Sequence, residues 1–480
     1  MEFSRNPLIY VMQLIHQSME SVEFDEDLIR RYDVPGPRYT SYPTAAQFSE
    51  RFGARQYINT VNDSNEDFIP KPLSLYFHIP FCSTVCYYCA CNKVVTKNRK
   101  HAETYLDHLK SEIKQQGKLM ARDRKVDQLH WGGGTPTFLN HDQIADLMEE
   151  TRKYFTLRND DRGEYSVEID PREANKQTIA LLRELGFNRM SVGVQDFDPK
   201  VQKAVNRIQS EEQTSEIMDA ARKEGFKSIS IDLIYGLPHQ TVESFSLTLD
   251  KIIKIQPDRL SVFNYAHMPH RFKTQKQINE ADLPSAPDKL KILKQTITQL
   301  TDAGYVYIGM DHFSKPDDEL ARAQKAYTLS RNFQGYSTHA DCDLIGLGAT
   351  AISKVRDTYS QNVHDLESYY RKIEHDGIAI ERGIALNDDD ILRREVIHQL
   401  ICHFELDIED IEYGYRVSFR DYFARELKQL EEMERDGLVF IDDKIIRILP
   451  KGRLLVRNIC MVFDRYTKPG TGAASFSKTI

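Results

Sequence analysis

Short apolar runs rich in β-branched and aromatic residues alternate along the chain with longer amphipathic stretches. Runs of four to eight such residues, bounded by turn residues, predict β-strands. Stretches such as 102–116 and 142–155 repeat their apolar residues at the spacing of a helix. This alternation predicts a parallel sheet covered by helices. The expected strands are residues 73–79, 126–131, 165–169, 189–194, 228–235 and 259–265, with 305–310 as a seventh candidate.

Polar residues and glycines follow nearly every expected strand. Four cysteines follow the first strand, a run of three glycines follows the second, and Asp170 and Gln195 follow the third and fourth. In a parallel barrel, functional residues lie at the carboxyl ends of the strands and on the loops after them. The sequence therefore predicts an α/β fold with a partial parallel β/α barrel of the TIM-like kind.

The two ends of the chain differ from this repeating pattern. An amphipathic helix near the N-terminus is followed by three prolines within residues 34–44, which favour an extended arm. From about residue 385, the order helix, helix, short hairpin, helix predicts a mostly α, winged-helix-like C-terminal domain. The predicted domains are an N-terminal arm (1–55), the barrel (56–360) and the C-terminal domain (361–480).

Composition narrows the class of protein. Hydrophobic residues make up 40% of the chain and charged residues 28%, as in a folded enzyme. The net charge of −8 disfavours a nucleic-acid or membrane-surface partner, and no apolar run approaches the 18 residues of a membrane span. The apolar N-terminal stretch lacks a cleavage pattern. We therefore expect a cytoplasmic protein.

The cysteines carry the first chemical signal. A disulfide framework would spread its cysteines and would need an oxidising compartment, so clustered cysteines indicate a metal. Structural zinc usually takes two cysteine pairs from separated segments, and a redox pair would leave two thiols unused. Three closely spaced thiolates can instead reach three corners of an iron–sulfur cluster from one loop, which is the favoured interpretation. Four of the seven cysteines lie within ten residues: Cys82, Cys86, Cys89 and Cys91.

The spacing C-x3-C-x2-C after the first strand, with the aromatic Tyr88 before the third cysteine, resembles the radical S-adenosylmethionine (radical SAM) superfamily. This resemblance implies that Cys82, Cys86 and Cys89 hold a 4Fe-4S cluster whose fourth iron is chelated by SAM. An electron from the cluster would then cleave SAM, and the resulting 5′-deoxyadenosyl radical would abstract hydrogen from an unactivated carbon.

Further motifs narrow the resemblance. Cys91, with YFHIPFC before it and CNK after it, is similar to the oxygen-independent coproporphyrinogen III oxidase (dehydrogenase) family. So are the segments GPRYTSYPT (36–44), HWGGGTPT (130–137), SVGVQDF (191–197) and IDLIYGLP (231–238). The likeness covers all but about the first twenty residues. It departs from the family pattern at His339 and Ala340, where Gln and Gly are common.

The resemblance also implies the ligand sites. Gly133 would contact SAM, Glu168 would hold its ribose hydroxyls, and Tyr76 and Ile352 would complete the site. Glycines suit such a position because they let the backbone approach a ligand. A second SAM lies beside the first in the family, either as a cosubstrate or in part of the porphyrinogen site. The matching positions for this second molecule are Tyr88, Gly134, Thr135, Gln195, Arg207, Asp232 and Ala266.

Two further residues are candidates for a catalytic role. His78 shares a strand face with Tyr76, so it is either a catalytic group near the cluster or a buried core histidine. Cys91 is the cysteine that the wider superfamily pattern leaves out. The isolated Cys342 and Cys402 are expected to be buried small side chains.

In this family the substrate is coproporphyrinogen III, and two of its propionates become the vinyl groups of protoporphyrinogen IX during haem biosynthesis. Arg38, Arg453 and Arg457 are candidates for pairing with propionates. We expect a monomer that needs a reductant and an electron acceptor. The alternatives are a haem chaperone of the same superfamily, another porphyrin-modifying radical SAM enzyme and a zinc-bearing structural protein.

Overall fold

A computed structural model describes residues 22–339, 341–467, 476 and 478 of the protein. The chain divides into two compact units. The larger unit contains Ala45–Gly304 and His339–Leu386, and the smaller contains the described residues of Met1–Thr44, Tyr305–Thr338 and Asn387–Ile480. The helix expected before residue 21 lies outside the described residues.

These units differ from the domain boundaries expected from the sequence. A boundary after residue 360 would cut through the strand Thr358–Asn362. Residues 305–338 belong with the C-terminal helices, since Gln324 Nε2 donates to the Cys402 carbonyl (2.8 Å) and Tyr336 Oη to the Ile401 carbonyl (2.9 Å). The smaller unit is therefore built from three separate segments of the chain.

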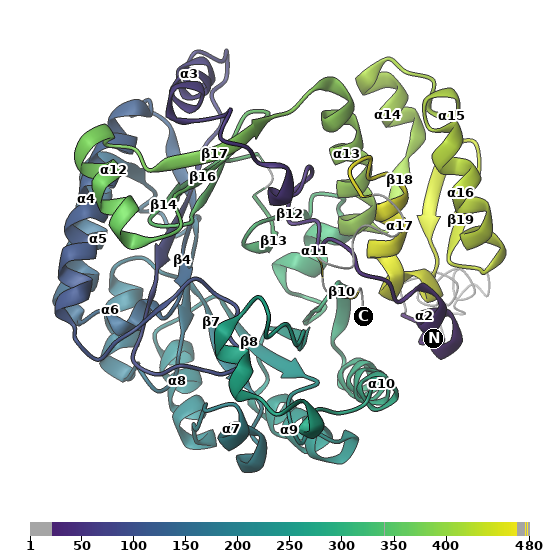
Figure 1. Ribbon diagram of the computed structural model, residues 1–480, viewed down its shortest axis with the longest axis horizontal. Coiled ribbons are helices and arrows are strands. Elements are labelled where there is room, and N and C mark those ends of the chain that lie inside the picture. Colours follow the sequence, from purple (N-terminus) through teal and green to yellow (C-terminus); the bar gives the residue numbers. More distant parts are fainter. Residues whose placement is uncertain (1–21, 340, 468–475, 477, 479–480) are drawn as a thin grey trace, which may run out of the picture. The chain divides into compact units, whose positions relative to one another are not determined.

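Parallel strands form the core of the larger unit (Figure 1). Within the described residues, six follow one another in the spatial order β1-β4-β6-β7-β8-β9, and every neighbouring pair is parallel. They match the six strands predicted from the sequence to within two residues. They are β1 (Leu73–Ile79), β4 (Lys125–Gly133), β6 (Glu164–Ile169), β7 (Arg189–Gln195), β8 (Ser228–Tyr235) and β9 (Arg259–Asn264).

The sheet continues on the other side of β1 with four strands that were not predicted. Strand β14 (Asp343–Leu347) pairs in parallel with β1, and antiparallel strands follow it. In the described part of this unit the strand order runs from β9 to β17 without closing, so the predicted partial barrel is confirmed. The antiparallel strands are β15 (Ile352–Val355), β16 (Thr358–Asn362) and β17 (Ile380–Ala385).

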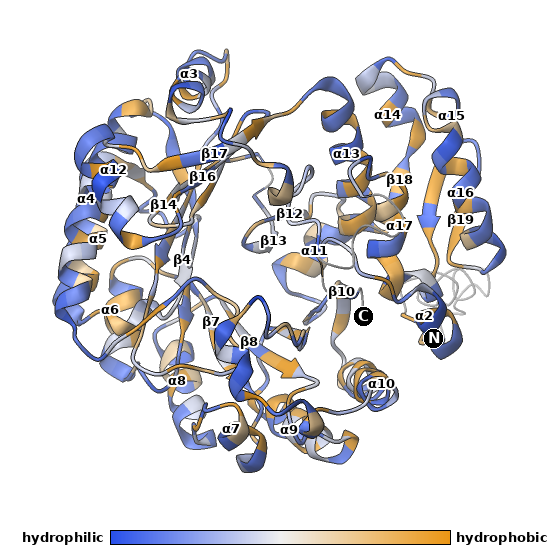
Figure 2. Ribbon diagram, in the orientation of Figure 1, coloured by the Kyte–Doolittle hydropathy of each residue, from blue (hydrophilic) through white to orange (hydrophobic). Residues whose placement is uncertain are grey.

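Helices connect the parallel strands, and α4, α5 and α6 lie along one side of the sheet in Figure 1. The predicted helices 102–116 and 142–155 are found as α4 and α5. Their apolar residues pack inward, and Figure 2 shows hydrophilic residues along their outer turns. The α-helices of this unit are α3 (Ala54–Asn65), α4 (Lys100–Leu119), α5 (His141–Tyr154), α6 (Lys176–Glu184), α7 (Pro199–Ala204), α8 (Glu211–Lys223), α9 (Val242–Ile255), α10 (Ala286–Asp302) and α12 (Leu366–Asp376). Its short elements are η1 (Ala45–Gln47), β2 (Phe81–Cys82), β3 (Val94–Val95), η2 (Pro136–Phe138), β5 (Thr156–Leu157), η3 (Lys273–Gln277) and η4 (Glu280–Asp282).

Aromatic residues fill the core beneath the carboxyl ends of the central strands. Trp131 on β4 is 1% exposed, and its ring lies 5.9 Å from that of Phe77 on β1 and 5.0 Å from that of Phe187. Strand β1 is buried along nearly its whole length, as expected for a parallel strand covered on both faces. The ends of β1 and β4 are therefore held by close packing.

The smaller unit combines helices with short antiparallel strands. In its C-terminal segment the predicted helices and hairpin are found as α13, α15 with α16, β19–β20 and α17, but β18 and α14, which were not predicted, lie between α13 and α15. Strands β18, β20 and β19 form an antiparallel sheet. Among the described helices of the chain, none is long and apolar enough to cross a membrane. The elements of this unit are α2 (Glu26–Tyr32), β10 (Val306–Gly309), β11 (His312–Ser314), α11 (Glu319–Lys325), β12 (Ser330–Asn332), β13 (Gly335–Ser337), α13 (Asp388–His403), β18 (Glu405–Asp407), α14 (Ile408–Tyr415), α15 (Phe419–Tyr422), α16 (Ala424–Arg435), β19 (Val439–Ile441), β20 (Ile445–Ile448), η5 (Pro450–Leu455) and α17 (Val456–Val462).

Candidate active site

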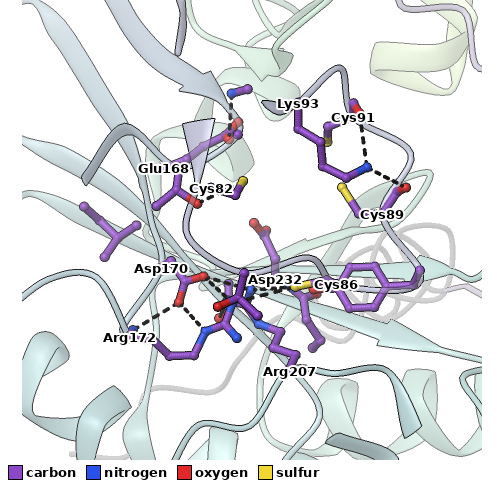
Figure 3. A pocket seen from close by; sticks show the side chains of 18 of the residues that line it. Cys82, Cys86, Cys89, Cys91, Lys93, Glu168, Asp170, Arg172, Arg207 and Asp232 are labelled. Atoms are coloured by element: carbon purple, nitrogen blue, oxygen red, sulfur yellow. Dashed lines mark hydrogen bonds and ion pairs between the residues drawn. The ribbon is translucent and has the colours of Figure 1, made fainter. Parts of the chain in front are cut away.

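A cavity of about 330 Å³ lies at the carboxyl ends of the parallel strands in the larger unit (Figure 3). It brings together most of the residues selected from the sequence, although they are spread over 150 positions of the chain. The predicted site residues that line it are Cys82, Cys86, Tyr88, Cys89, Cys91, Gly133, Gly134, Thr135, Glu168, Gln195, Arg207 and Asp232. Residues that sequence reasoning did not select also line it, among them Lys93, Arg172, Ser191 and Phe263.

The loop that carries the cysteines is fixed at both ends. It begins at β2 and ends at β3, and these two short strands pair in parallel. Because the loop between them has no regular secondary structure, its carbonyl groups need partners from elsewhere. Side chains supply them: Asn206 Nδ2 donates to the Val85 carbonyl (2.8 Å), Thr274 Oγ1 and Lys93 Nζ to the Cys89 carbonyl (3.0 and 3.2 Å), and Gln275 Nε2 to the Tyr88 carbonyl (3.1 Å).

Each of the first three thiols of the motif has its own surroundings. The sulfur of Cys82 accepts a hydrogen bond from Thr135 Oγ1 at 3.5 Å, and burial raises the pKa of this thiol to about 11. The hydrogen bond from Cys91 lowers the pKa of Cys89 to about 6. The sulfur of Cys86 lies 3.6 Å from a guanidinium nitrogen of Arg207. A bound metal would replace these thiol protons.

The donor set fits a cluster better than a single ion. Across the described residues, no three His, Cys, Asp or Glu side chains meet as ligands of one metal ion. The corners of an iron–sulfur cluster are separated, so thiols spread along one loop suit it. The four cysteines of the loop face the same cavity in Figure 3, with Lys93 donating to the carbonyls of Cys89 and Cys91.

The glycine run at the end of β4 packs so closely against its neighbours that a side chain would not fit there. Gly133 has a φ of 112°, and a Cβ there would come within 2.6 Å of the His78 imidazole. A Cβ on Gly134 would lie 2.7 Å from the Pro80 carbonyl carbon. Both contacts are too short for real atoms, so this approach of the strand end to the cysteine loop requires glycine.

Glu168 connects this strand end to a histidine. Its Oε2 accepts the Gly133 N–H at 3.2 Å, and its Oε1 lies 3.3 Å from His130 Nε2. The surrounding protein would raise the pKa of Glu168, but the hydrogen bond and charge of His130 together with the Gly133 N–H lower it overall. The carboxylate is therefore ionised at neutral pH, and its side chain is 43% exposed towards the cavity.

A group of charged side chains forms the opposite wall. Asp170 accepts hydrogen bonds from Arg172 (2.7 Å) and Arg207 (3.0 Å), and these guanidinium groups outweigh burial and lower the pKa of Asp170 to about 2. Burial instead raises the pKa of the neighbouring Asp232 to about 6, although Ser191 Oγ donates to it at 2.7 Å. Gln195 stands at the end of β7 with a φ of 70°, next to an irregularity in the pairing of β7 with β8.

Four predicted site residues lie behind the cavity wall. Tyr76 stacks on His130 at 5.8 Å, and its hydroxyl lies 3.2 Å from Nδ1 of His78. His78 is 5% exposed, and its Nε2 lies 3.0 Å from the Asn92 carbonyl, so both ring nitrogens have protein partners. Burial lowers its pKa. Of the two interpretations that the sequence leaves open, this environment favours a core histidine that supports the glycine run.

The other two are backbone neighbours of the site. The Ala266 carbonyl accepts from Gln275 Nε2 at 3.2 Å, the same nitrogen that reaches the cysteine loop. Ile352 opens β15, and its backbone lies against Gly346, which is paired with Tyr76 across β14 and β1.

Residues 339 and 342 lie away from this cavity. His339 Nε2 is 4.0 Å from Glu164, the first residue of β6, and Asp343 pairs with the first residue of β1. This stretch is thus at the amino ends of the strands, opposite the site. Cys342 and Cys402 are buried, as predicted.

The arginines considered for propionate binding all belong to the smaller unit. Arg38 pairs with Asp311, and Arg453 lies over the Phe404 ring at 4.6 Å. Arg457 is 4% exposed and donates to the Pro37 carbonyl at 2.9 Å and to the Gly36 carbonyl. Arg457 therefore fastens the proline-rich arm.

Comparisons with known proteins agree with this arrangement. Residues 76–252 match the Radical SAM superfamily, and residues 386–455 match the HemN C-terminal domain. The matched residues carry the parallel sheet and the cysteine loop described above, so the protein is a radical SAM enzyme whose cofactors are a 4Fe-4S cluster and SAM.

Individual relatives narrow the assignment to one family within this superfamily. The chain is 55% identical over 462 residues to the oxygen-independent coproporphyrinogen III oxidase of Pseudomonas aeruginosa, and 51% identical over 463 residues to that of Escherichia coli. In both cases 96% of this chain and 100% of the relative are covered. The solved structure of coproporphyrinogen III oxidase (HemN) from Escherichia coli matches with a TM-score of 0.89 and 50% identity, over 93% of this chain and 100% of that one. The chain belongs to the oxygen-independent coproporphyrinogen III oxidase family.

Proposed function

We propose that the protein converts coproporphyrinogen III to protoporphyrinogen IX without oxygen, by oxidative decarboxylation of two propionates to two vinyl groups in haem biosynthesis. The observation that carries this proposal is the cavity itself, in which the cysteine loop, the glycine run of β4 and Glu168 face one another. The full-length identity to relatives named for this reaction supports the choice of substrate.

We propose Cys82, Cys86 and Cys89 as the ligands of the 4Fe-4S cluster. When bound, the cluster and SAM supply a 5′-deoxyadenosyl radical that abstracts hydrogen from an unactivated carbon. Three thiolates would leave one iron open for the amino and carboxylate groups of SAM. Cys91 is the fourth thiol of the loop, and we assign it a catalytic role at the cavity, with His78 supporting the wall behind it.

The SAM site is proposed around the end of β4. Gly133 offers a backbone surface without a Cβ, and the ionised Glu168 can accept hydrogen bonds from two ribose hydroxyls. Tyr76 and Ile352 lie next to these residues and would complete the site.

A second SAM is proposed beside the first. Arg207 supports this assignment, because its Nε is buried and has no hydrogen-bond partner among the described residues, while its other nitrogens are bonded. A buried donor without a partner is costly, and a ligand at this wall would satisfy it. Tyr88, Gly134, Thr135, Gln195, Asp232 and Ala266 would surround the same ligand.

We also propose that the protein works in the cytoplasm as a monomer, with an external reductant and an external electron acceptor. Each hydrogen abstraction leaves one electron on the substrate after carbon dioxide departs, so an acceptor is required for balance. The clustered cysteines support a reducing compartment.

The ligand assignment can be tested by cysteine replacement. Wild-type protein prepared anaerobically should carry about four irons. Cys82→Ala, Cys86→Ala and Cys89→Ala should each abolish stable binding of this iron. Cys91→Ala should keep the iron and lose turnover, and Cys342→Ala serves as a control far from the loop. Iron and sulfide are measured directly. Loss of iron in Cys91→Ala with retention in one of the other three would contradict the assignment.

The reaction is tested by anaerobic turnover with dithionite and an electron acceptor. Protoporphyrinogen IX, carbon dioxide and 5′-deoxyadenosine should form together, with two carbon dioxides and two cleaved SAM molecules for each product. Deuterium at the propionate β-carbons should appear in the deoxyadenosine. Tight haem binding without any decarboxylated product would instead favour the haem chaperone.

A further inference from the structure

Cys86 is the cysteine of the loop whose sulfur lies next to two arginine side chains. Its sulfur lies 3.7 Å from Nη2 of Arg172 and 3.6 Å from Nη1 of Arg207, both within range for an N–H···S hydrogen bond. Cys82 instead accepts from the neutral hydroxyl of Thr135, and Cys89 from Cys91 and Lys93. Two guanidinium groups therefore converge on one sulfur, as Figure 3 shows.

A carboxylate holds these guanidinium groups in place. Asp170 accepts from Nε and Nη2 of Arg172 at 3.0 and 2.7 Å, which is the two-point arrangement that fixes a guanidinium in its plane. Its Oδ2 also accepts from Arg207 at 3.0 Å. The Arg172 and Arg207 side chains are only 17% and 8% exposed. Solvent therefore screens their charges little.

The hydrogen bonds of this group leave both guanidinium groups within reach of the sulfur. Asp170 accepts from Arg172 and Arg207, and each guanidinium still lies within hydrogen-bond distance of Cys86. Arg207 already has a proposed ligand, whereas the Arg172 side chain, among the described residues, donates to Asp170 and Cys86. Arg172 is therefore the residue whose position calls for a separate explanation.

We propose that Arg172, oriented by Asp170, makes the cluster easier to reduce through its N–H···S hydrogen bond to Cys86. This inference rests on the proposed role of Cys86 as a cluster ligand. Reduction adds one electron, and the extra negative charge is spread over the cluster and its sulfurs. A cationic donor stabilises that charge more than the oxidised state, which raises the reduction potential. Arg172 is thus a positioning residue for electron entry.

The test compares the ratio of reduced to oxidised cluster at a fixed potential. The full-length protein is titrated anaerobically with dithionite without SAM, and the reduced cluster is quantified by electron paramagnetic resonance. Arg172→Gln removes the charge and the two-point contact, and we expect the ratio to fall about tenfold, because hydrogen bonds to the sulfurs help to set a cluster's potential. A tenfold change corresponds to about 59 mV for a one-electron couple.

Two further variants make the test specific. Arg172→Lys keeps the charge but cannot make the planar contact, so its ratio should lie between those of wild type and Arg172→Gln. Arg183→Gln is a matched control, because Arg183 also pairs with an aspartate, Asp161, but lies on α6 and contacts no cysteine. Its ratio should equal that of wild type.

The outcomes separate the inference from the proposed function. Equal ratios for Arg172→Gln and wild type, with equal iron content, would refute the inference and leave the proposed function intact. Loss of the cluster in both Arg172 variants would also refute it, because Arg172 would then be required for assembly rather than for reduction. A wild-type protein that binds no four-iron cluster would contradict the proposed function itself.

Discussion

Replacing Glu168 by glutamine tests the SAM site with the smallest change of shape. Glutamine keeps the size of the side chain but removes the negative charge that the ribose hydroxyls would meet. A hydrogen bond to a charged group contributes about 1.5–3 kcal/mol. Because the Glu168 side chain is 43% exposed, solvent screens part of this energy and the lower value applies. The dissociation constant for SAM should therefore rise about tenfold.

The assay is anaerobic equilibrium binding of SAM to the cluster-loaded protein, with iron content measured in the same samples. Iron content should not change, since Glu168 contributes no thiol. Glu164→Gln is the matched control, because Glu164 lies on the same strand at its opposite end, where it accepts from Gln128 Nε2 at 3.1 Å. An unchanged dissociation constant in Glu168→Gln, or an equal rise in Glu164→Gln, would remove Glu168 from the site.

Two further predictions concern the support of the site. Gly133→Ala and Gly225→Ala both place a side chain at positive φ, but only the new Cβ at position 133 collides with a neighbour, the His78 ring. In thermal unfolding, Gly225→Ala should lower the free energy of unfolding by about 1 kcal/mol, and Gly133→Ala should lower it by about 1–3 kcal/mol more. SAM binding should be lost only in Gly133→Ala. An equal loss of stability in the two variants would show that Gly133 does not pack tightly against His78. Burial raises the pKa of Glu112 to about 7, above its ordinary 4.5, so its protonated form favours the folded state, and this stability is lost as the pH rises through 7. Between pH 4.5 and 8, the free energy of unfolding measured with denaturant should fall by about 3 kcal/mol more in wild type than in Glu112→Gln. Parallel pH curves for the two proteins would contradict the raised pKa.

The sequence was most informative where a local pattern decides the structure. Each of the six predicted strands is a short apolar run that ends in turn residues, and a central parallel strand such as β1 is recognisable because it is buried on both faces. The cysteine spacing is local in the same sense. The expectation that polar residues gather at the carboxyl ends of parallel strands selected Asp170 and Gln195, and both line one cavity.

Long-range pairing explains what the sequence did not predict. Strand β14 is only five residues long, and nothing in residues 343–347 shows that they pair with β1, about 270 positions earlier. Thr274 and Gln275 support the cysteine loop from 185 or more positions away, through side chains with no distinctive local pattern. Arg172 follows β6 closely in the chain, but its contact with Cys86 depends on how two loops meet. These contacts are set by tertiary packing, which periodicity does not report.

A buried polar network explains why the first cysteine stands at a fixed point. The hydroxyl of Tyr105 on α4 donates to the His78 carbonyl at 2.7 Å and accepts from the Ala349 N–H at 3.2 Å. Glu112, about two turns further along α4, accepts from the Gly348 N–H at 2.7 Å. Each of these groups is buried and bonded, so moving the end of β1 would leave polar atoms without partners. Because β1 ends only three residues before Cys82, a rigid strand end is the most direct way for a loop without regular structure to present its first thiol in a constant position.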